Sequence, residues 1–206
     1  MRIRVQPYIE WEYPRPRFGT AGIVDRIAGP GATRGERIVQ FLLPLVAALT
    51  AVWYGSYAAA TWNTVQYVLC GVLAFDIVGG IVTGASSPGK RWFHRPERDS
   101  LWHASFGVLH LVHPLAVALV FMEGDLAWFA LTGGYLLVGT AVILASPLHL
   151  RRPLAFMVYT GSLVLALYIV NAPPALEWFV PLLYVKLFLA LPLREEPYRP
   201  GGCRLG

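Results

Sequence analysis

Residues 102–122, WHASFGVLHLVHPLAVALVFM, decide the class of fold because they form one apolar segment that is interrupted mainly by histidines. About 20 consecutive apolar residues in a helix span the hydrocarbon core of a bilayer, and this segment has that length. It contains three of the five histidines of the chain, His103, His110 and His113. The stretch therefore predicts a membrane-spanning helix that carries ionisable groups at membrane depth.

The rest of the chain repeats the apolar pattern. Its residues are 56% hydrophobic and 14% charged, whereas charged residues make up about a quarter of a typical soluble domain. Further apolar segments, separated by turn-forming residues, bring the number of predicted spans to six. These spans are residues 38–60, 63–85, 102–122, 126–146, 154–171 and 177–193. The sequence thus predicts an all-α, polytopic membrane protein built as a six-helix transmembrane bundle over residues 38–193.

The distribution of basic residues predicts how this bundle is oriented. All Lys and Arg residues except Lys186 lie in the N-terminal segment, in the second and fourth connections or in the tail. The alternate connections carry only acidic charges, Glu123, Asp125 and Glu177. Cytoplasmic loops are rich in Lys and Arg, so we expect both termini to be cytoplasmic in a multi-pass protein of the cell (inner or plasma) membrane. The net charge of +5 then reflects topology, and we expect no nucleic-acid partner.

Two terminal segments flank the predicted spans. Residues 1–37 form a predicted cytoplasmic arm that mixes basic and aromatic residues, and residues 194–206 form a cytoplasmic tail. Such a mixture favours contact with the membrane surface. A partner subunit in a membrane complex is an equal alternative for the arm.

Small residues mark the places where helices are expected to pack closely. Gly80 and Gly84 are spaced in this way in the second span, as are Ala130 and Gly134 in the fourth. We expect these faces to pack the second span against the fourth within one chain. A homo-oligomer is the alternative.

Four ionisable residues, Asp76, His110, His113 and Lys186, are predicted to lie well inside the hydrocarbon. Each costs several kcal/mol there when it is unpaired, so each is expected to have a partner or a function. The helical rise places Asp76, His110 and Lys186 about 10–14 Å below the cytoplasmic surface, with His113 about one turn deeper. Lys186 either pairs with Asp76 or extends its charge toward the cytoplasm, and its long side chain favours the second alternative.

The histidines form a series that leads from the cytoplasmic surface toward the middle of the bilayer. In a helix, His103, His110 and His113 lie within an arc of about 80°. Pro114 leaves the carbonyl of His110 without its helical hydrogen bond, which predicts a kink and a spare acceptor beside the imidazoles. His94 in the second connection lies at the cytoplasmic end of this series, and His94 and His103 are candidate cofactor-binding residues.

We therefore predict a site formed by Asp76, His110 and His113 that is open to the cytoplasm. Two imidazoles and a carboxylate are a common ligand set of catalytic metals, so these three residues are candidate catalytic groups and also candidate ligands of a divalent metal such as zinc or iron. Arg91 and Arg95 in the second connection are the candidate anchors for the anionic headgroup of a substrate.

Three functions remain open on the sequence. The first is a membrane-embedded enzyme, metal-dependent or not, that acts on a lipid-phase or amphiphilic substrate, with Asp76 as ligand or general base and the histidines as ligands or proton shuttles. The second is a proton-coupled transporter or proton pathway in which the same residues relay protons. The third is a non-catalytic helical subunit of a larger membrane complex, whose polar layer is purely structural.

Overall fold

The computed structural model describes residues 13–58 and 61–194, in which every regular element is a helix. Five helical segments of 20–25 residues are long and apolar enough to cross a membrane, so the chain is a multi-pass membrane protein. They are α2 (Arg34–Ala58), α3 (Thr64–Ala85), α5–α6 (Ser100–Leu109 and Val112–Phe121), α7 (Leu126–Ala145), and α8 with the π-helix η1 (Leu148–Val164 and Leu165–Ile169). Large apolar side chains such as Leu49 and Val65 are exposed on the outer faces, as expected for helices that contact lipid. The first 12 residues of the predicted arm, and the tail beyond residue 194, lie outside the described residues.

The sixth predicted span, 177–193, forms a shorter helix at the centre of the bundle. It consists of α9 (Phe179–Tyr184), with 6 residues, and the π-helix η2 (Val185–Ala190), with 6 residues. At a rise of 1.5 Å per residue this length reaches about 18 Å, which is less than the thickness of the hydrocarbon core. Phe179, Leu183 and Phe188 are buried, so the segment is a core helix of the bundle, and a sixth crossing stays a prediction.

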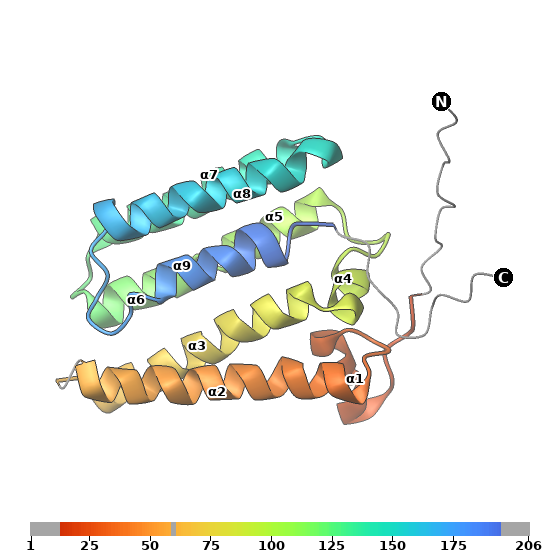
Figure 1. Cartoon of the computed structure of the whole chain (residues 1–206), viewed down its shortest axis with the longest axis horizontal. Helices are drawn as coiled ribbons and strands as arrows, with labels where there is room; N and C mark the ends of the chain where they lie inside the picture. Colours follow the sequence, from red (N-terminus) through yellow and green to blue (C-terminus); the bar gives the residue numbers. More distant parts are fainter. Residues whose placement is uncertain (1–12, 59–60, 195–206) are drawn as a thin grey trace.

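The helices form three layers (Figure 1). α2 and α3 lie together in one outer layer, α7 and α8 form the opposite layer, and α5, α6 and α9 lie between them. Gly80 and Gly84 of α3 are in close contact with Lys186 and Ala190 of η2, where a Cβ on either glycine would collide. The predicted close packing within one chain is therefore present, but the prediction that α3 packs on α7 is wrong, because η2 occupies that face of α3.

One helix boundary also differs from the prediction. The fifth span was expected to begin at residue 154, after a loop that includes Arg151 and Arg152, but α8 begins at Leu148. Pro153 lies inside this helix. The proline removes one hydrogen bond, the one to the carbonyl of His149, and that loss near the first turn does not prevent the helix from forming.

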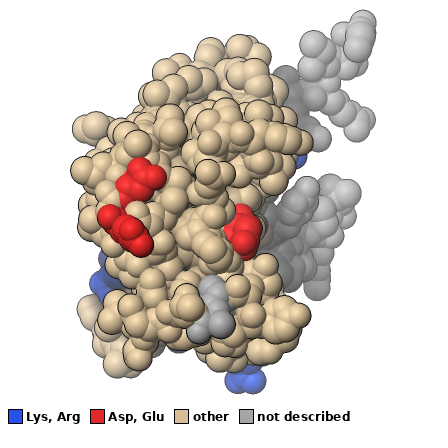
Figure 2. Space-filling view, turned by 90° about the vertical axis from the view of Figure 1, so that its left-hand side faces the viewer, with Lys and Arg blue, Asp and Glu red and all other residues tan. Residues whose placement is uncertain are grey.

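The two ends of the bundle differ in charge. The connections around residues 61–63, 122–125 and 171–178 gather at the left-hand end of Figure 1. Figure 2 faces this end and shows carboxylates on it, while Lys and Arg are visible only at its margin. Side chains cap the N-termini of α3 and α7 at this end. Asn63 forms a capping box with Gln66, and Asp125 accepts a hydrogen bond from the amide of Trp128.

The opposite, basic end carries two short helices, α1 (Gly19–Ala28) and α4 (Ser87–Phe93), which pack against each other. Gln40 of α2 joins them, because its amide donates to the carbonyl of Ala28 and to the hydroxyl of Ser86. Trp92 of α4 donates to the carbonyl of Arg26 in α1. This part of the predicted arm is thus an ordered helix docked on the end of the bundle.

An ion pair fixes the start of α1 and leads to a testable pH dependence. The guanidinium of Arg17 binds Asp25 through contacts of 2.9 and 2.8 Å and lowers the pKa of that carboxyl to about 2. A carboxyl whose pKa is depressed by folding adds stability above its unfolded pKa of about 3.9, and this stability is lost as the pH falls toward the folded value. We expect Arg17→Gln to raise the pKa of Asp25 toward that unfolded value and to speed amide exchange in α1 at pH 7. NMR titration and hydrogen exchange measure these two effects, and an unchanged pKa in the variant would refute the assignment.

Candidate functional site

The third span is broken at the point that Pro114 predicts. α5 ends at Leu109 and α6 begins at Val112. The carbonyl of His110, which Pro114 cannot bond, accepts hydrogen bonds from the backbone amide of His113 at 3.1 Å and from its Nδ1 at 3.2 Å. The predicted break in the helix is confirmed. The carbonyl of His110, which was predicted to be a spare acceptor, binds the imidazole of His113.

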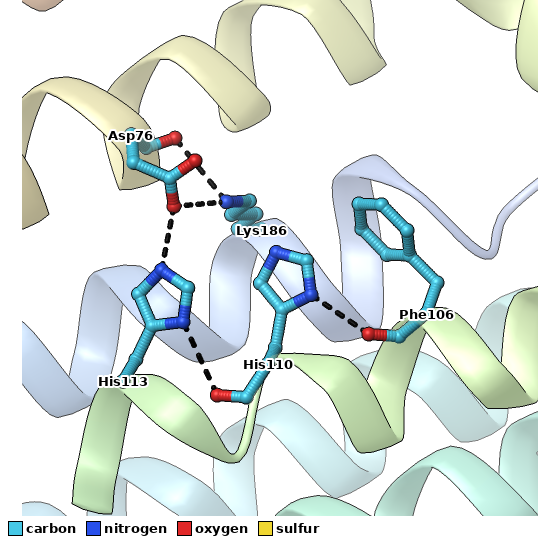
Figure 3. Close-up of polar contacts among 5 residues, drawn as sticks. All are labelled: Asp76, Phe106, His110, His113 and Lys186. Carbon is cyan, nitrogen blue, oxygen red and sulfur yellow. Dashed lines mark hydrogen bonds and ion pairs between the residues drawn. The ribbon is translucent and has the colours of Figure 1, made fainter. Parts of the chain in front are cut away.

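The two imidazoles of this break are held in the same way. Nδ1 of His110 lies 2.7 Å from the carbonyl of Phe106, and the rings of His110 and His113 are stacked 4.9 Å apart with an angle of 3° between their planes. A carbonyl can only accept, so Nδ1 carries the proton in both rings. Figure 3 shows both Nε2 atoms on the side of Asp76 and Lys186.

Asp76 on α3 joins this pair to the central helix. Its Oδ2 lies 2.7 Å from Nε2 of His113 and 2.5 Å from Nζ of Lys186, which also donates to the backbone carbonyl of Asp76 at 3.3 Å. The sequence favoured Lys186 extending toward the cytoplasm, and that prediction is wrong. Its side chain is only 3% exposed and lies against Gly80, where the missing side chain makes room for the lysine stem.

The hydrogen bonds limit the protonation states of the cluster. Both nitrogens of His113 face oxygen atoms, and its Nδ1 must donate to a carbonyl. Its Nε2 therefore either donates to the carboxylate of Asp76 as part of an imidazolium, or accepts a proton that Asp76 carries. One proton is shared between these two groups. A metal ion would displace this proton, and a proton pathway would transfer it.

The site is exposed at the side of the bundle. The side chain of Asp76 is 47% exposed, whereas that of His113 is 12% exposed. Asp76 lies nine residues before Ala85, the end of α3, which is about 14 Å along the helix. The carboxylate of Asp76 is therefore partly exposed about midway along α3, while its partners His113 and Lys186 are largely buried within the protein.

The arrangement brings together the residues predicted to form the site. Asp76, His110 and His113 each offer a ligand atom, and these atoms lie within 4.8 Å of one another. The expectation that three helices place ionisable groups in one layer is confirmed, with Lys186 as the contribution of the third helix. The roles assigned to these residues stay predictions.

The other predicted residues lie at the basic end. The rings of His94 and His103 are stacked 4.9 Å apart, separate from the Asp76 cluster. Burial, with the charges of His103 and Lys90, lowers the pKa of His94 to about 3. Arg91 is buried, and Arg95 lies over the ring of Trp92 and pairs with Glu97. Both arginines thus make contacts within the protein, and their role as headgroup anchors stays a prediction.

Comparison with protein-family models, curated proteins and solved structures finds no match. The fold and the site define the class of this protein: a multi-pass helical membrane protein with a carboxylate–imidazole–lysine cluster at membrane depth. Within this class, the geometry of the cluster carries the argument for function.

Proposed function

We propose that the protein is a membrane-embedded, divalent-metal-dependent enzyme that acts on a lipid-phase substrate. Its metal ligands would be Nε2 of His110, Nε2 of His113 and the carboxylate of Asp76. The observation that carries the proposal is the shared orientation of the two imidazoles, whose Nδ1 protons are bound by backbone carbonyls. Metal-binding histidines are commonly held by such hydrogen bonds, which direct the other nitrogen to the metal.

The donor set suits zinc or ferrous iron, because two imidazoles and one carboxylate leave coordination positions for water and substrate. Binding of the metal would displace the proton between His113 and Asp76, so metal uptake should release protons. Lys186 hydrogen-bonds the carboxylate of Asp76 and would hold that ligand in position. A bound metal would supply an activated water molecule or polarise a substrate oxygen.

The exposure of Asp76 supports a substrate from the lipid phase. The carboxylate lies at membrane depth on the side of the bundle, so an amphiphile can reach it from the bilayer without leaving the membrane. The proposal keeps the prediction from the sequence that the site opens to the cytoplasm. This opening would be the route for water and protons.

A second candidate, a proton pathway, is favoured by a specific observation. Asp76 is already hydrogen-bonded to Lys186 and His113, so the carboxylate and His113 have partners without a metal. Titratable groups that share a proton at membrane depth are typical of proton carriers.

Metal analysis of gently solubilised protein separates these functions. We expect about one zinc or iron ion per chain, and loss of affinity by about 100-fold or more in His110→Ala, His113→Ala and Asp76→Asn. His149→Ala is the matched control, because His149 is exposed on α8, and it should retain the metal.

The remaining outcomes exclude the enzyme proposal in different ways. Metal-free protein that moves protons in liposomes, and stops doing so in Asp76→Asn, would identify the proton pathway. Metal-free protein that moves no protons would leave the cluster a structural element of a membrane subunit.

A further inference from the structure

A second polar cluster lies at the basic end, about two helical turns from His110. It is centred on the stacked rings of His94 and His103. Nδ1 of His103 lies 2.8 Å from the carbonyl of Asp99, and His94 hydrogen-bonds the backbone of Leu191. Both Nε2 atoms are buried, and neither finds a hydrogen-bond partner within residues 13–58 and 61–194.

A shallow pocket adjoins the ring of His103. Its cavity measures about 20 Å³, its empty space reaches about 350 Å³ when the open solvent at its mouth is counted, and its lining includes Trp102, His103, Thr140 and Leu144. Thr140 is only 8% exposed, and its hydroxyl also has no hydrogen-bond partner in the described part of the chain. Buried polar atoms are normally satisfied by protein, water or a ligand, so the unsatisfied atoms of His103 and Thr140 are available to a polar ligand in the pocket.

Two arginines from different elements contact residues that line the pocket. The guanidinium of Arg98 lies 4.3 Å above the ring of Trp102, and that of Arg151 donates to the carbonyl of Leu144. Each therefore contacts a residue that lines the pocket. The Nε atoms of both are buried, and the structure, as far as it describes the chain, gives them no acceptor. The nearby carboxylate of Asp99 accepts a hydrogen bond from the amide of Trp102 and makes none with the Nε atom of either arginine.

The unsatisfied atoms define the chemistry of the ligand. The Nε atoms of Arg98 and Arg151 are charged donors without an acceptor, and a phosphate oxygen suits them well. His103 donates through Nδ1 to the carbonyl of Asp99, so its neutral ring presents a lone pair at Nε2 that can accept from a donor such as a hydroxyl group. The ligand must therefore combine a phosphate with free hydroxyl groups.

We infer that this pocket binds a hydroxyl-bearing phosphate ester, the polyol-phosphate headgroup of an anionic lipid. Its position at the end of the membrane-spanning helices is the level of lipid headgroups, where Trp102 is typical of an interface. Leu101 and Leu148 at the same end are 75% and 62% exposed, and they offer apolar surface to acyl chains. The inference stands apart from the metal site, since it shares none of the Asp76, His110 and His113 ligands.

The test measures lipid binding to full-length protein in nanodiscs by native mass spectrometry. We expect phosphatidylglycerol to bind better than phosphatidic acid, which carries a phosphate but no free hydroxyl. Arg98→Gln and Arg151→Gln should each weaken binding of phosphatidylglycerol about tenfold, the loss expected for one charged hydrogen bond. Arg152→Gln removes the same charge from the neighbouring, exposed residue and should change binding by about twofold at most.

The histidines provide the second arm of the test. His103→Phe should reduce the binding of phosphatidylglycerol to the level of phosphatidic acid, because it removes an acceptor for a hydroxyl group. Competition by soluble glycerol phosphate would show that the free phosphate ester is bound as well, whereas lack of competition would show that the acyl chains are required. Equal effects of Arg151→Gln and Arg152→Gln, or no preference for phosphatidylglycerol in the wild type, would overturn the inference.

Discussion

Asp76→Asn is expected to lower the free energy of unfolding by about 3 kcal/mol, because it leaves the buried ammonium group of Lys186 without its counter-ion. The side chain of Lys186 is 3% exposed and its Nζ lies 2.5 Å from Oδ2 of Asp76. Asparagine keeps the shape of the side chain and removes the negative charge. The measurement is SDS-induced unfolding in mixed micelles of lipid and detergent.

Removal of the other partner of the ion pair should lower the free energy of unfolding by a smaller amount, which makes the prediction specific. Lys186→Met leaves Asp76 with His113 as a partner and with a side chain that is 47% exposed, so we expect a loss of about 1 kcal/mol. The double variant, Asp76→Asn with Lys186→Met, should be more stable than Asp76→Asn alone, because it also removes the unpaired ammonium group. Glu123→Gln, at the acidic end, is the charge-matched control and should change little. Equal losses in the two single variants, with no recovery in the double variant, would show that the ion pair is not the source of stability.

Gly139→Ala is expected to destabilise the bundle by about 1–3 kcal/mol, since the added methyl group would overlap the core. A Cβ at this position would lie 2.6 Å from the ring of Phe188 and 2.7 Å from the side chain of Val158. Both neighbours are buried, so neither can move aside without shifting η2 or α8.

Gly134→Ala is the matched control on the same helix. A Cβ there meets no atom within 4 Å in the described structure, so the substitution should stabilise α7 by up to about 1 kcal/mol through helix propensity. Thermal unfolding of the two variants in the same detergent gives the comparison. The packing of α7 against η2 would be wrong if Gly139→Ala were as stable as Gly134→Ala.

Several features of the candidate site could be predicted from the chain alone. The distance along a helix axis follows from residue number, so the sequence correctly placed Asp76, His110 and Lys186 in one layer. The kink at His110 followed from the missing amide of Pro114. The route of the Lys186 side chain could not be predicted in this way, because a lysine at that depth can either extend to the surface or pair, and the choice depends on which helix lies beside it.

The same limit applies to the faces of small residues. Their spacing in α3 correctly indicated close packing, but it contains no information about the partner, which is η2. The cluster at the basic end was only partly predicted. His94 and His103 were recognised, whereas Thr140 and Arg151 became candidates only when the structure showed their unsatisfied atoms at or beside the pocket.

The sequence by itself determined that the chain is a multi-pass helical membrane protein, and it determined which polar residues lie at the same level along neighbouring helices. Apolar length and helical rise act within one segment, so both can be read along the chain. Only the tertiary structure decided that the segment after residue 177 is a short central helix, that Lys186 binds Asp76, and that His103 stacks on His94 and not on His110. The physical reason is that the neighbours of a helix, and its rotation toward them, result from packing of all side chains in the bundle at once.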